Sequence, residues 1–228
     1  MIPHRIVEVL GITGFIGLEL LIGARAWPVL RSDHNALWAA AAVLGGFVAA
    51  DFVSGLIHWG FDRYGTSSTP VLGANFIVPF REHHVDPKGI TRHDFVETNG
   101  NNCIATMPVL LPIAALDPAA GLPWLLLQLV LASMCLFVMG TNQFHKWAHQ
   151  DQPPLLVVAL MKAHLILETK HHDKHHTPPF DRYYCITSGW LNPLLDKVQF
   201  FKRFEQLIEK TTGTRAGEDD AKVVAEVG

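Results

Sequence analysis

The sequence predicts an all-α fold, a helical bundle that crosses a membrane about four times. Three observations lead to this expectation. Hydrophobic residues make up 49% and charged residues 17% of the 228 residues, and the mean hydropathy is +0.21, a balance unusual for a soluble domain. Several apolar runs approach the roughly 20 residues that a helix needs to cross a bilayer. The polar segments beside these runs carry most of the 13 histidines.

The first expected span covers residues 6–24, which are mostly apolar. Glu8 and Glu19 interrupt the run, and Arg25 ends it. A cleaved signal peptide is the alternative, but the two glutamates and the lack of a small-x-small cleavage site argue against it. Residues 1–35 are therefore expected to form an N-terminal span and an outer loop.

The second expected span covers residues 36–59. Its many Ala and Gly residues permit close packing against neighbouring helices. Asp51 and His58 lie in its final turns. Because an ionisable group in a span usually faces a site or a polar cavity, we expect a site close to the membrane boundary.

Residues 62–102 form a polar connection that glycine and proline interrupt at many points. The segment nevertheless holds more coordinating and hydrogen-bonding groups than a simple connector needs. These groups are His83, His84, Asp86, His93, Asp94, Glu97, Asn99, Asn101 and Asn102. We expect part of this segment to contribute to a site.

Two apolar segments, residues 103–116 and 122–140, are expected to form a helical hairpin. The second is long enough to span a bilayer, whereas the first is short, and Pro108 and Pro112 favour a kinked or partly re-entrant path. Two crossings return the chain to the side it left, so histidines before and after the hairpin share one membrane face. Of the 18 Lys and Arg residues, 15 follow residue 60, which by the positive-inside rule makes that face cytoplasmic.

The remaining segments are expected to lie at or outside the membrane surface. Residues 153–168 are apolar but short, and predict a helix in the interface or packed under the site. Apolar residues recur at helical spacing over 194–208 with basic residues between them, which predicts an amphipathic surface helix that ends at Gly213. The tail, 214–228, is expected to be acidic and disordered. The main domain then covers residues 36–213.

The densest group of histidines is the run HHDKHH at residues 171–176. On a helix, spacings of three and four residues would place all four imidazoles on one face. His145 and His149 have the same spacing. Imidazoles this close would repel one another when protonated, so a bound metal is the reason we infer for keeping them neutral. A solvated histidine-rich tract is the alternative.

The number of histidines suggests two metal ions. Eleven of them, all except His4 and His34, lie in these clusters or at the expected face, whereas a single zinc takes about four protein ligands. Imidazoles without paired cysteines suit iron, zinc or copper. The candidate ligands are His58, His83, His84, His93, His145, His149, His164, His171, His172, His175 and His176. Candidates for orienting these imidazoles are Asp51, Asp86, Asp94, Glu97 and Asn142.

Three classes of function fit this sequence poorly. A net charge of -3 and the lack of a nucleic-acid motif exclude DNA or RNA as a partner. A zinc protease needs a glutamate inside HExxH, where this chain has Lys146. A metal transporter would place polar groups deep in several spans. What remains is a dinuclear, oxygen-activating centre that acts on a lipid chain, with a non-catalytic metal-binding membrane scaffold as the alternative.

Five motifs follow one another along the chain: DFVSGLIHW at 51–59, PFREHHVDP at 79–87, ITRHDFVETNG at 90–100, TNQFHKWAH at 141–149 and CITSGWLN at 185–192. Together they resemble the plasmanylethanolamine desaturase family, also called Kua or CarF-type lipid desaturases. The two histidine boxes of that family, HxxxH and HxxHH, fall on His145 with His149 and on His172, His175 and His176. The resemblance covers roughly residues 50–213.

The resemblance implies a membrane desaturase with two iron ions (Fe2+/Fe3+) and O2 as co-substrate. Its substrate would be a membrane ether phospholipid, whose 1-O-alkyl chain becomes the 1-O-alk-1'-enyl chain of a plasmalogen. An external electron donor, a small cytochrome or ferredoxin, would supply electrons. A plant relative desaturates the acyl chain of phosphatidylglycerol near its carboxyl end, so an acyl-lipid desaturase is the alternative. We expect a multi-pass protein of a bacterial inner membrane or a eukaryotic endoplasmic reticulum.

Overall fold

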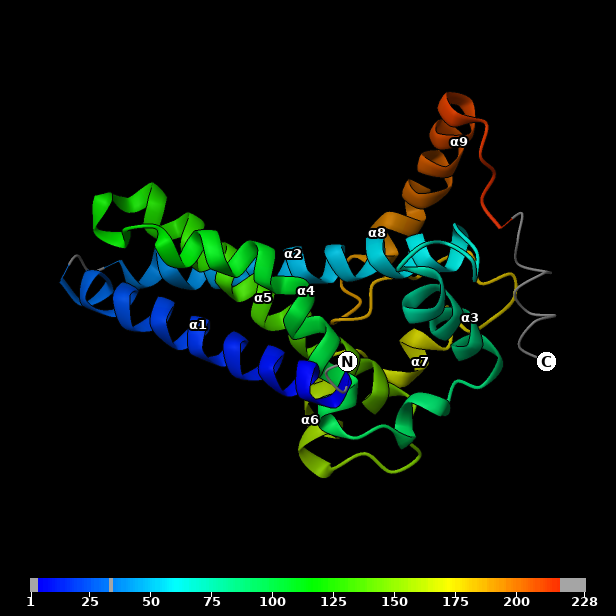
Figure 1. Ribbon diagram of the computed structural model, residues 1–228, viewed down its shortest axis with the longest axis horizontal. Coiled ribbons are helices and arrows are strands. Elements are labelled where there is room, and N and C mark those ends of the chain that lie inside the picture. The colour runs from blue at the N-terminus through cyan, green and yellow to red at the C-terminus, as the bar shows by residue number, and fades with distance from the viewer. Residues whose placement is uncertain (1–3, 33–34, 218–228) are drawn as a thin grey trace. The chain divides into compact units, whose positions relative to one another are not determined.

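The computed structural model describes residues 4–32 and 35–217, and every regular element in these ranges is a helix (Figure 1). The all-α class is therefore confirmed for the described part of the chain. The chain divides into two compact units, each built from two separate segments. The first unit combines Met1–Asp51 with His93–Phe144, and the second combines Phe52–Arg92 with His145–Gly228.

Among the described residues, three helices are long and apolar enough to cross a membrane: α1 (His4–Ser32), α2 (Ala36–Arg63) and α5 (Leu122–Ala148). The first helix does not end at Arg25, as the sequence predicted, but continues to Ser32. The Arg25 guanidinium donates a hydrogen bond to the carbonyl oxygen of Ala114. The charge within this apolar helix therefore has a polar partner inside the unit.

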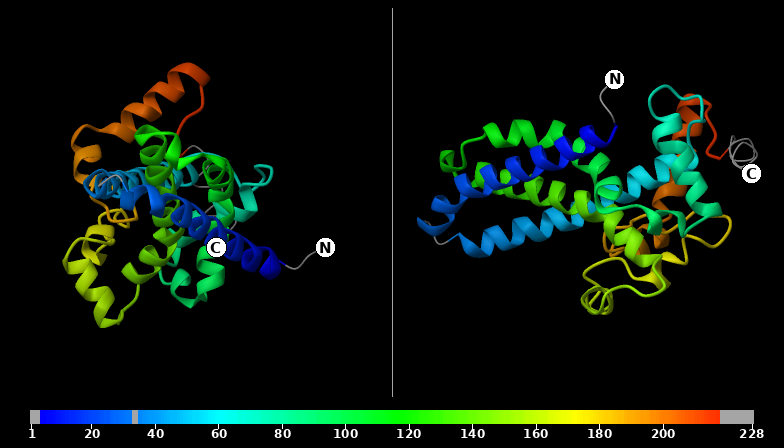
Figure 2. Two further views of the ribbon diagram at one scale, coloured as in Figure 1. Left: turned by 90° about the vertical axis from the view of Figure 1, so that its left-hand side faces the viewer. Right: turned by 60° about the horizontal axis from the view of Figure 1, so that its bottom comes forward.

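Helix α4 (Phe95–Ala115) is longer than the expected segment 103–116 and runs alongside α1 in the first unit (Figure 2). Its N-terminus is capped by Asp94, whose Oδ1 accepts hydrogen bonds from the backbone N–H groups of Val96 (2.9 Å) and Glu97 (3.0 Å). The first turns of α4 are polar, and the helix is not among the three that qualify as spans. The expected number of about four crossings therefore stays a prediction.

Helices α2 and α5 approach closely in the first unit, as the small residues of α2 predict. A Cβ atom on Gly46 would collide with the Ser133 hydroxyl and the Val130 carbonyl on α5. Glycine at this position thus lets the two backbones meet. Buried apolar side chains fill the rest of this unit, among them Phe15, Ile22, Leu110, Ile113 and Cys135.

The second unit consists of the ends of α2 and α5 together with short elements. These are η1 (Gly73–Ile77), α3 (Val78–Val85), η2 (Gly89–Arg92), α6 (Leu155–Lys162), α7 (Thr169–His172), α8 (Asn192–Lys197) and α9 (Phe200–Thr212). Its apolar core contains Trp59, Tyr184, Cys185, Leu195 and Phe201. Short helices and turns, rather than long spans, therefore shape this unit.

Two expectations for the second unit need correction. The run 171–176 is helical only to His172, where α7 ends after a single turn, so its four imidazoles do not share one helical face. The predicted amphipathic helix over 194–208 is divided at Gln199, whose φ of 51° is left-handed. The helix expected over 153–168 is present as α6 but covers only Leu155–Lys162, and its place in the membrane interface stays a prediction. Most of the expected disordered tail, 218–228, lies outside the described residues.

The end of the amphipathic segment was predicted correctly. Helix α9 stops at Gly213, which adopts a left-handed φ of 75° and donates its backbone N–H to the carbonyl oxygen of Glu209. Glycine is the residue that takes this conformation without a Cβ penalty. Leu207 on this helix is exposed whereas Phe201 is buried, so α9 has one apolar face in the core and further apolar side chains at the surface.

Candidate metal centre

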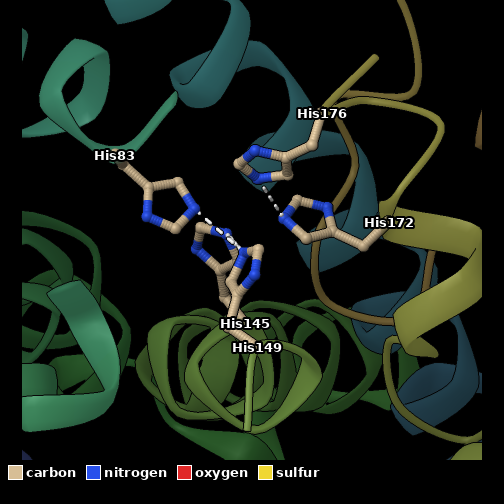
Figure 3. Close-up of side chains that lie close together, drawn as sticks. All are labelled: His83, His145, His149, His172 and His176. Carbon is tan, nitrogen blue, oxygen red and sulfur yellow. Dashed lines mark hydrogen bonds between the residues drawn. The ribbon is translucent and has the colours of Figure 1, made fainter. Parts of the chain in front are cut away.

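Two groups of ligand-type side chains converge in the described part of the second unit. The five-histidine group consists of His83, His145, His149, His172 and His176 (Figure 3). The Asp62 group consists of His58, Asp62, His84 and His175. In each group one ligand atom per residue lies within 4.8 Å of all the others.

Three elements bring the five-histidine group together. His145 and His149 project from the last turn of α5 and the residue after it, and His83 comes from α3. His172 ends α7, and His176 follows in the turn behind it. Figure 3 shows the five rings pointing toward a common centre. The adjacent His84 serves the other group, because neighbouring residues on a helix point about 100° apart.

The spacing inside the five-histidine group fits one metal ion. The Nε2 atoms of His83 and His149 lie 3.0 Å apart, those of His145 and His149 lie 3.2 Å apart, and those of His172 and His176 lie 3.0 Å apart. Nitrogen ligands at about 2.1 Å from one ion, at right angles, would be separated by about 3.0 Å. The observed distances therefore match those expected between neighbouring ligands of a single ion.

Burial keeps the imidazoles outside the spans neutral. Loss of solvation lowers the pKa of His83 and His172 well below the ordinary value, and the neighbouring imidazoles lower it further. The same burial lowers the pKa of His149 to about 4 and of His176 to about 2. At neutral pH these rings are thus uncharged and carry a lone pair that can bind a metal.

In the Asp62 group, backbone carbonyls fix the orientation of two imidazoles. His58 Nδ1 lies 3.1 Å from the carbonyl oxygen of Tyr184, and His175 Nδ1 lies 2.9 Å from that of Arg182. A neutral imidazole that donates its Nδ1 proton in this way has a bare lone pair on Nε2. Both Nε2 atoms face Asp62 Oδ2, at 3.3 Å for His58 and 3.4 Å for His175.

This arrangement of lone pairs fits a cation. Both carboxylate oxygens of Asp62 and Nε2 of His58 are buried and have no hydrogen-bond donor. A buried carboxylate without a partner is costly, and lone pairs that face one another at such distances repel. Burial also lowers the pKa of His84 to about 4, although the Asp62 carboxylate partly offsets this effect. A metal ion among these atoms would satisfy all of them at once.

The segment that carries these carbonyls is held against α2. Ser54 Oγ accepts a hydrogen bond from the backbone N–H of Ile186 (3.1 Å). A Cβ atom on Gly55 would collide with Cys185, so only glycine permits this approach. The Asn192 side chain bonds both the N–H and the C=O of Cys185, each at 2.8 Å. The Tyr184 carbonyl is thereby positioned beside His58.

Eight of the eleven histidines predicted as ligands lie in the two groups. The other three belong to neither. His93 is exposed with Nε2 3.7 Å from Glu97, and His164 follows the end of α6, exposed and with a left-handed φ of 55°. His171 Nε2 lies 3.1 Å from the Asn192 amide nitrogen, because the single turn of α7 does not align it with His175.

The five residues predicted to orient the imidazoles also lie outside both groups. Asp86 pairs with Arg92 at 2.6 Å, and Asp94 caps α4 and pairs with Arg5 at 2.7 Å. Glu97 lies beside the exposed His93, and Asn142 donates to the carbonyl of Thr98 (3.2 Å). Asp51 is fully buried in the first unit. In the Asp62 group, backbone carbonyls hold two of the imidazoles instead.

Sequence reasoning missed two residues of this site. Asp62 follows His58 by four residues on α2, and this i,i+4 spacing was a signal that could have found it. Arg81 is buried and donates to the carbonyl oxygens of Phe61 (3.3 Å) and Gly65 (3.0 Å). It thereby ties α3, with its two histidines, to the end of α2.

Comparison with known proteins gives consistent results. Residues 47–219 match the lipid desaturase domain family. The chain is 49% identical over 217 residues to the plasmanylethanolamine desaturase of Myxococcus xanthus, covering 95% of this chain and 76% of the relative. It is 46% identical over 198 residues to plasmanylethanolamine desaturase 1 of Mus musculus, with coverages of 84% and 72%.

A plant relative is more distant. The chain is 35% identical over 186 residues to the chloroplastic fatty acid desaturase 4 of Arabidopsis thaliana, covering 80% of this chain and 55% of the relative. No solved structure matches the chain.

Proposed function

The chain belongs to the lipid desaturase family, and we propose that it converts 1-O-alkyl-2-acyl phosphatidylethanolamine to the 1-O-alk-1'-enyl vinyl ether of a plasmalogen. It is a desaturase, an oxidoreductase, and a membrane protein. The ether substrate is supported by the identities of 49% and 46% to relatives named for it, against 35% for the plant fatty acid desaturase. An acyl-lipid desaturase is the second candidate.

The observation that carries the proposal is the pair of ligand groups in the second unit. We assign one ion to the five-histidine group and another to the Asp62 group. Imidazole and carboxylate ligands without thiolate suit iron, which we propose as the metal. When bound, two irons supply the reduction of O2 and the removal of hydrogen from an unactivated carbon chain.

The overall reaction balances with one external donor. Two hydrogen atoms leave neighbouring carbons of the alkyl chain, and O2 is reduced to two molecules of water. Of the four electrons needed, the substrate provides two, and we propose that an electron-transfer protein, a small cytochrome or ferredoxin, provides two with two protons taken from solvent. The desaturation therefore requires a reductant besides the lipid.

The residues of the chain bind and orient rather than react. The carbonyls of Tyr184 and Arg182 hold His58 and His175 with Nε2 toward Asp62. Asp62 adds the negative charge that a pair of cations in a buried site requires. His58, His172 and His175 are at most 1% exposed, so these side chains exclude water from the place where the chain is oxidised.

The position of the site along the spans supports desaturation next to the glycerol linkage. His58 and Asp62 lie in the last turns of α2, and His145 lies in the last turn of α5. We therefore propose that the centre sits near the depth of the lipid head groups, on the cytoplasmic face. Of the 18 Lys and Arg residues, 15 follow residue 60, which favours that face by the positive-inside rule. Only the first carbons of a lipid chain reach this depth.

Isotope labelling tests the proposed reaction directly. An alkyl-ether phosphatidylethanolamine deuterated at alkyl carbons 1 and 2 is supplied with O2 and a reductant to the purified protein. We expect an acid-labile vinyl ether that has lost deuterium from both carbons, and no product from the His172→Ala variant. Retention of all label together with a new double bond in an acyl chain would favour the acyl-lipid desaturase instead.

A further inference from the structure

A surface pocket of about 280 Å³ lies in the second unit, next to the Asp62 group. Its wall includes Arg182, whose carbonyl oxygen accepts the hydrogen bond from His175 Nδ1 at 2.9 Å. The residues that define its chemistry are Asp181, Arg182, Tyr183, Asp196, Phe200 and Lys202. One wall of the pocket is thus one hydrogen bond away from a candidate metal ligand.

The four charged side chains of this pocket are unpaired. Asp181, Arg182, Asp196 and Lys202 are all exposed, and none forms an ion pair or a side-chain hydrogen bond with a described residue. Some exposed acids elsewhere in this unit do pair, such as Asp151 with Lys88 at 2.6 Å and Glu209 with Arg215 at 2.8 Å. Two anions and two cations that line one pocket without neutralising each other suit a zwitterionic ligand.

We propose that this pocket binds the phosphoethanolamine head group of the lipid, an inference that rests on the proposed function. Arg182 and Lys202 offer donors to a phosphate, and arginine can bind it with two parallel hydrogen bonds. Asp181 and Asp196 accept hydrogen bonds from a primary ammonium. A quaternary ammonium has no N–H to donate, so the two carboxylates select ethanolamine over choline.

The surroundings of the pocket favour a lipid over a soluble metabolite. Leu194 and Val198 on α8 and in the turn after it are exposed next to the pocket residues Leu195 and Asp196. Exposed apolar side chains beside basic ones are typical of a helix in the membrane interface. In an ether lipid the first alkyl carbon is only a few bonds from the phosphate. A head group held beside Arg182 therefore keeps the reacting carbons near His175 and the Asp62 group.

Lipid retention by the purified full-length protein tests this assignment without relying on turnover. Native mass spectrometry measures how much alkyl-ether phosphatidylethanolamine and alkyl-ether phosphatidylcholine the protein retains from an equimolar mixture. We expect wild type to prefer the ethanolamine lipid about tenfold, since one charge-assisted hydrogen bond is worth that factor. Asp181→Asn combined with Asp196→Asn should bring the ratio close to one while choline-lipid retention stays the same.

Matched variants separate the two halves of the pocket. Glu209→Gln removes a negative charge from α9 outside the pocket and should leave the tenfold ratio unchanged. Arg182→Gln with Lys202→Gln should weaken retention of both lipids equally, because both carry the phosphate. Metal content measured in every variant shows whether the neighbouring site stays folded.

Several outcomes would overturn the assignment. An unchanged ratio in the double aspartate variant would do so, as would a preference for choline, which Tyr183 and Phe200 could bind through their aromatic faces. If free phosphoethanolamine at a concentration equal to the lipid displaces it, the pocket serves a soluble ligand. Selective retention of the ethanolamine lipid without any vinyl ether product would instead contradict the proposed function and leave the head-group pocket intact.

Discussion

The five-histidine group and the Asp62 group differ in what holds their ligand side chains in position. The five-histidine group contains only imidazoles, and the Nδ1 atoms of His172 and His176 are buried without a hydrogen-bond partner. In the Asp62 group a carboxylate joins three imidazoles, and backbone carbonyls hold two of these at Nδ1. The Asp62 group is therefore oriented by the protein, whereas the five-histidine group depends more on the metal itself for its order.

Helix α3 links the two groups. His83 and His84 are adjacent, yet the first belongs to the five-histidine group and the second to the Asp62 group. Arg81, on the same helix, bonds the chain just beyond α2 at Gly65 and the carbonyl of Phe61. A shift of α3 would thus disturb both groups at once. Substitutions of residues that belong to one group alone are therefore needed to test how the two groups differ.

The largest effect is expected from loss of a ligand in the five-histidine group. His145→Ala, His172→Ala and His176→Ala should each lower turnover by more than about 100-fold. A loss of about 100-fold is the largest that is usual when a residue only orients a metal ligand. Membrane insertion should not change, because the apolar spans drive it. Turnover is measured as vinyl ether product and insertion by membrane extraction. Near-normal activity in all three variants would remove this group from the site.

Substitution of the single carboxylate tests the Asp62 group. Asp62→Asn keeps the shape but removes the charge, so we expect loss of activity and of the metal in this group, with the five-histidine group still loaded. Asp86→Asn is the control, since Asp86 is exposed, pairs with Arg92 and belongs to neither group. Metal content per chain and turnover are both measured. Full metal content in Asp62→Asn would show that the carboxylate is not a ligand.

The number of metal ions per chain tests whether both groups bind a metal. If both groups bind iron, protein purified without chelators and protected from oxidation should contain about two iron ions per chain, because nine ligand side chains exceed the capacity of one ion. Removal of the metal by a chelator should destabilise the five-histidine group more than the Asp62 group, seen as faster amide exchange around α7. A single zinc or copper ion per chain, with activity retained, would contradict the two-ion assignment.

Comparison of these groups also shows what the sequence could predict. The all-α class and the eight grouped histidines followed from apolar length, helical spacing and long motifs. Asp62 was missed because a charged residue at the end of an apolar run is usually taken to mark where the helix leaves the membrane. The carbonyls of Tyr184 and Arg182 could not be predicted, since every residue has one and only tertiary packing selects two.

The length of a short helix was the other limit. His171 to His176 look equivalent on a helical projection, but α7 makes one turn and its end sends His171 toward Asn192 and His175 toward the Asp62 group. One-turn helices are decided by tertiary contacts rather than by local spacing. The positions of individual histidines in this run therefore depend on Asn192 and its neighbours, which lie about twenty residues away.

Intermediate effects are expected from the three histidines outside both groups. His93→Ala, His164→Ala and His171→Ala should keep the full metal content and lower turnover less than about tenfold. His171→Ala should have the largest effect of the three, because its partner Asn192 also holds Cys185 beside α2. Metal content is measured in each variant. A loss of metal in any of them would show that the substituted histidine is a ligand in one of the two groups.

The smallest effect is expected for Asp94, which distinguishes helix capping from orientation of an imidazole. The Arg5 guanidinium and the backbone N–H groups of α4 hold the pKa of Asp94 well below its usual range. Because the folded pKa is depressed, the stabilisation is present above the unfolded value near pH 4 and is lost as the pH falls toward the folded value. Asp94→Ala should therefore lower thermal stability slightly at pH 7 and by less at pH 3, while turnover changes less than about twofold.

Asp94→Asn, which can still cap the helix, should be closer to wild type than Asp94→Ala. A large loss of turnover with unchanged stability would mean that Asp94 acts on the metal centre and not on α4.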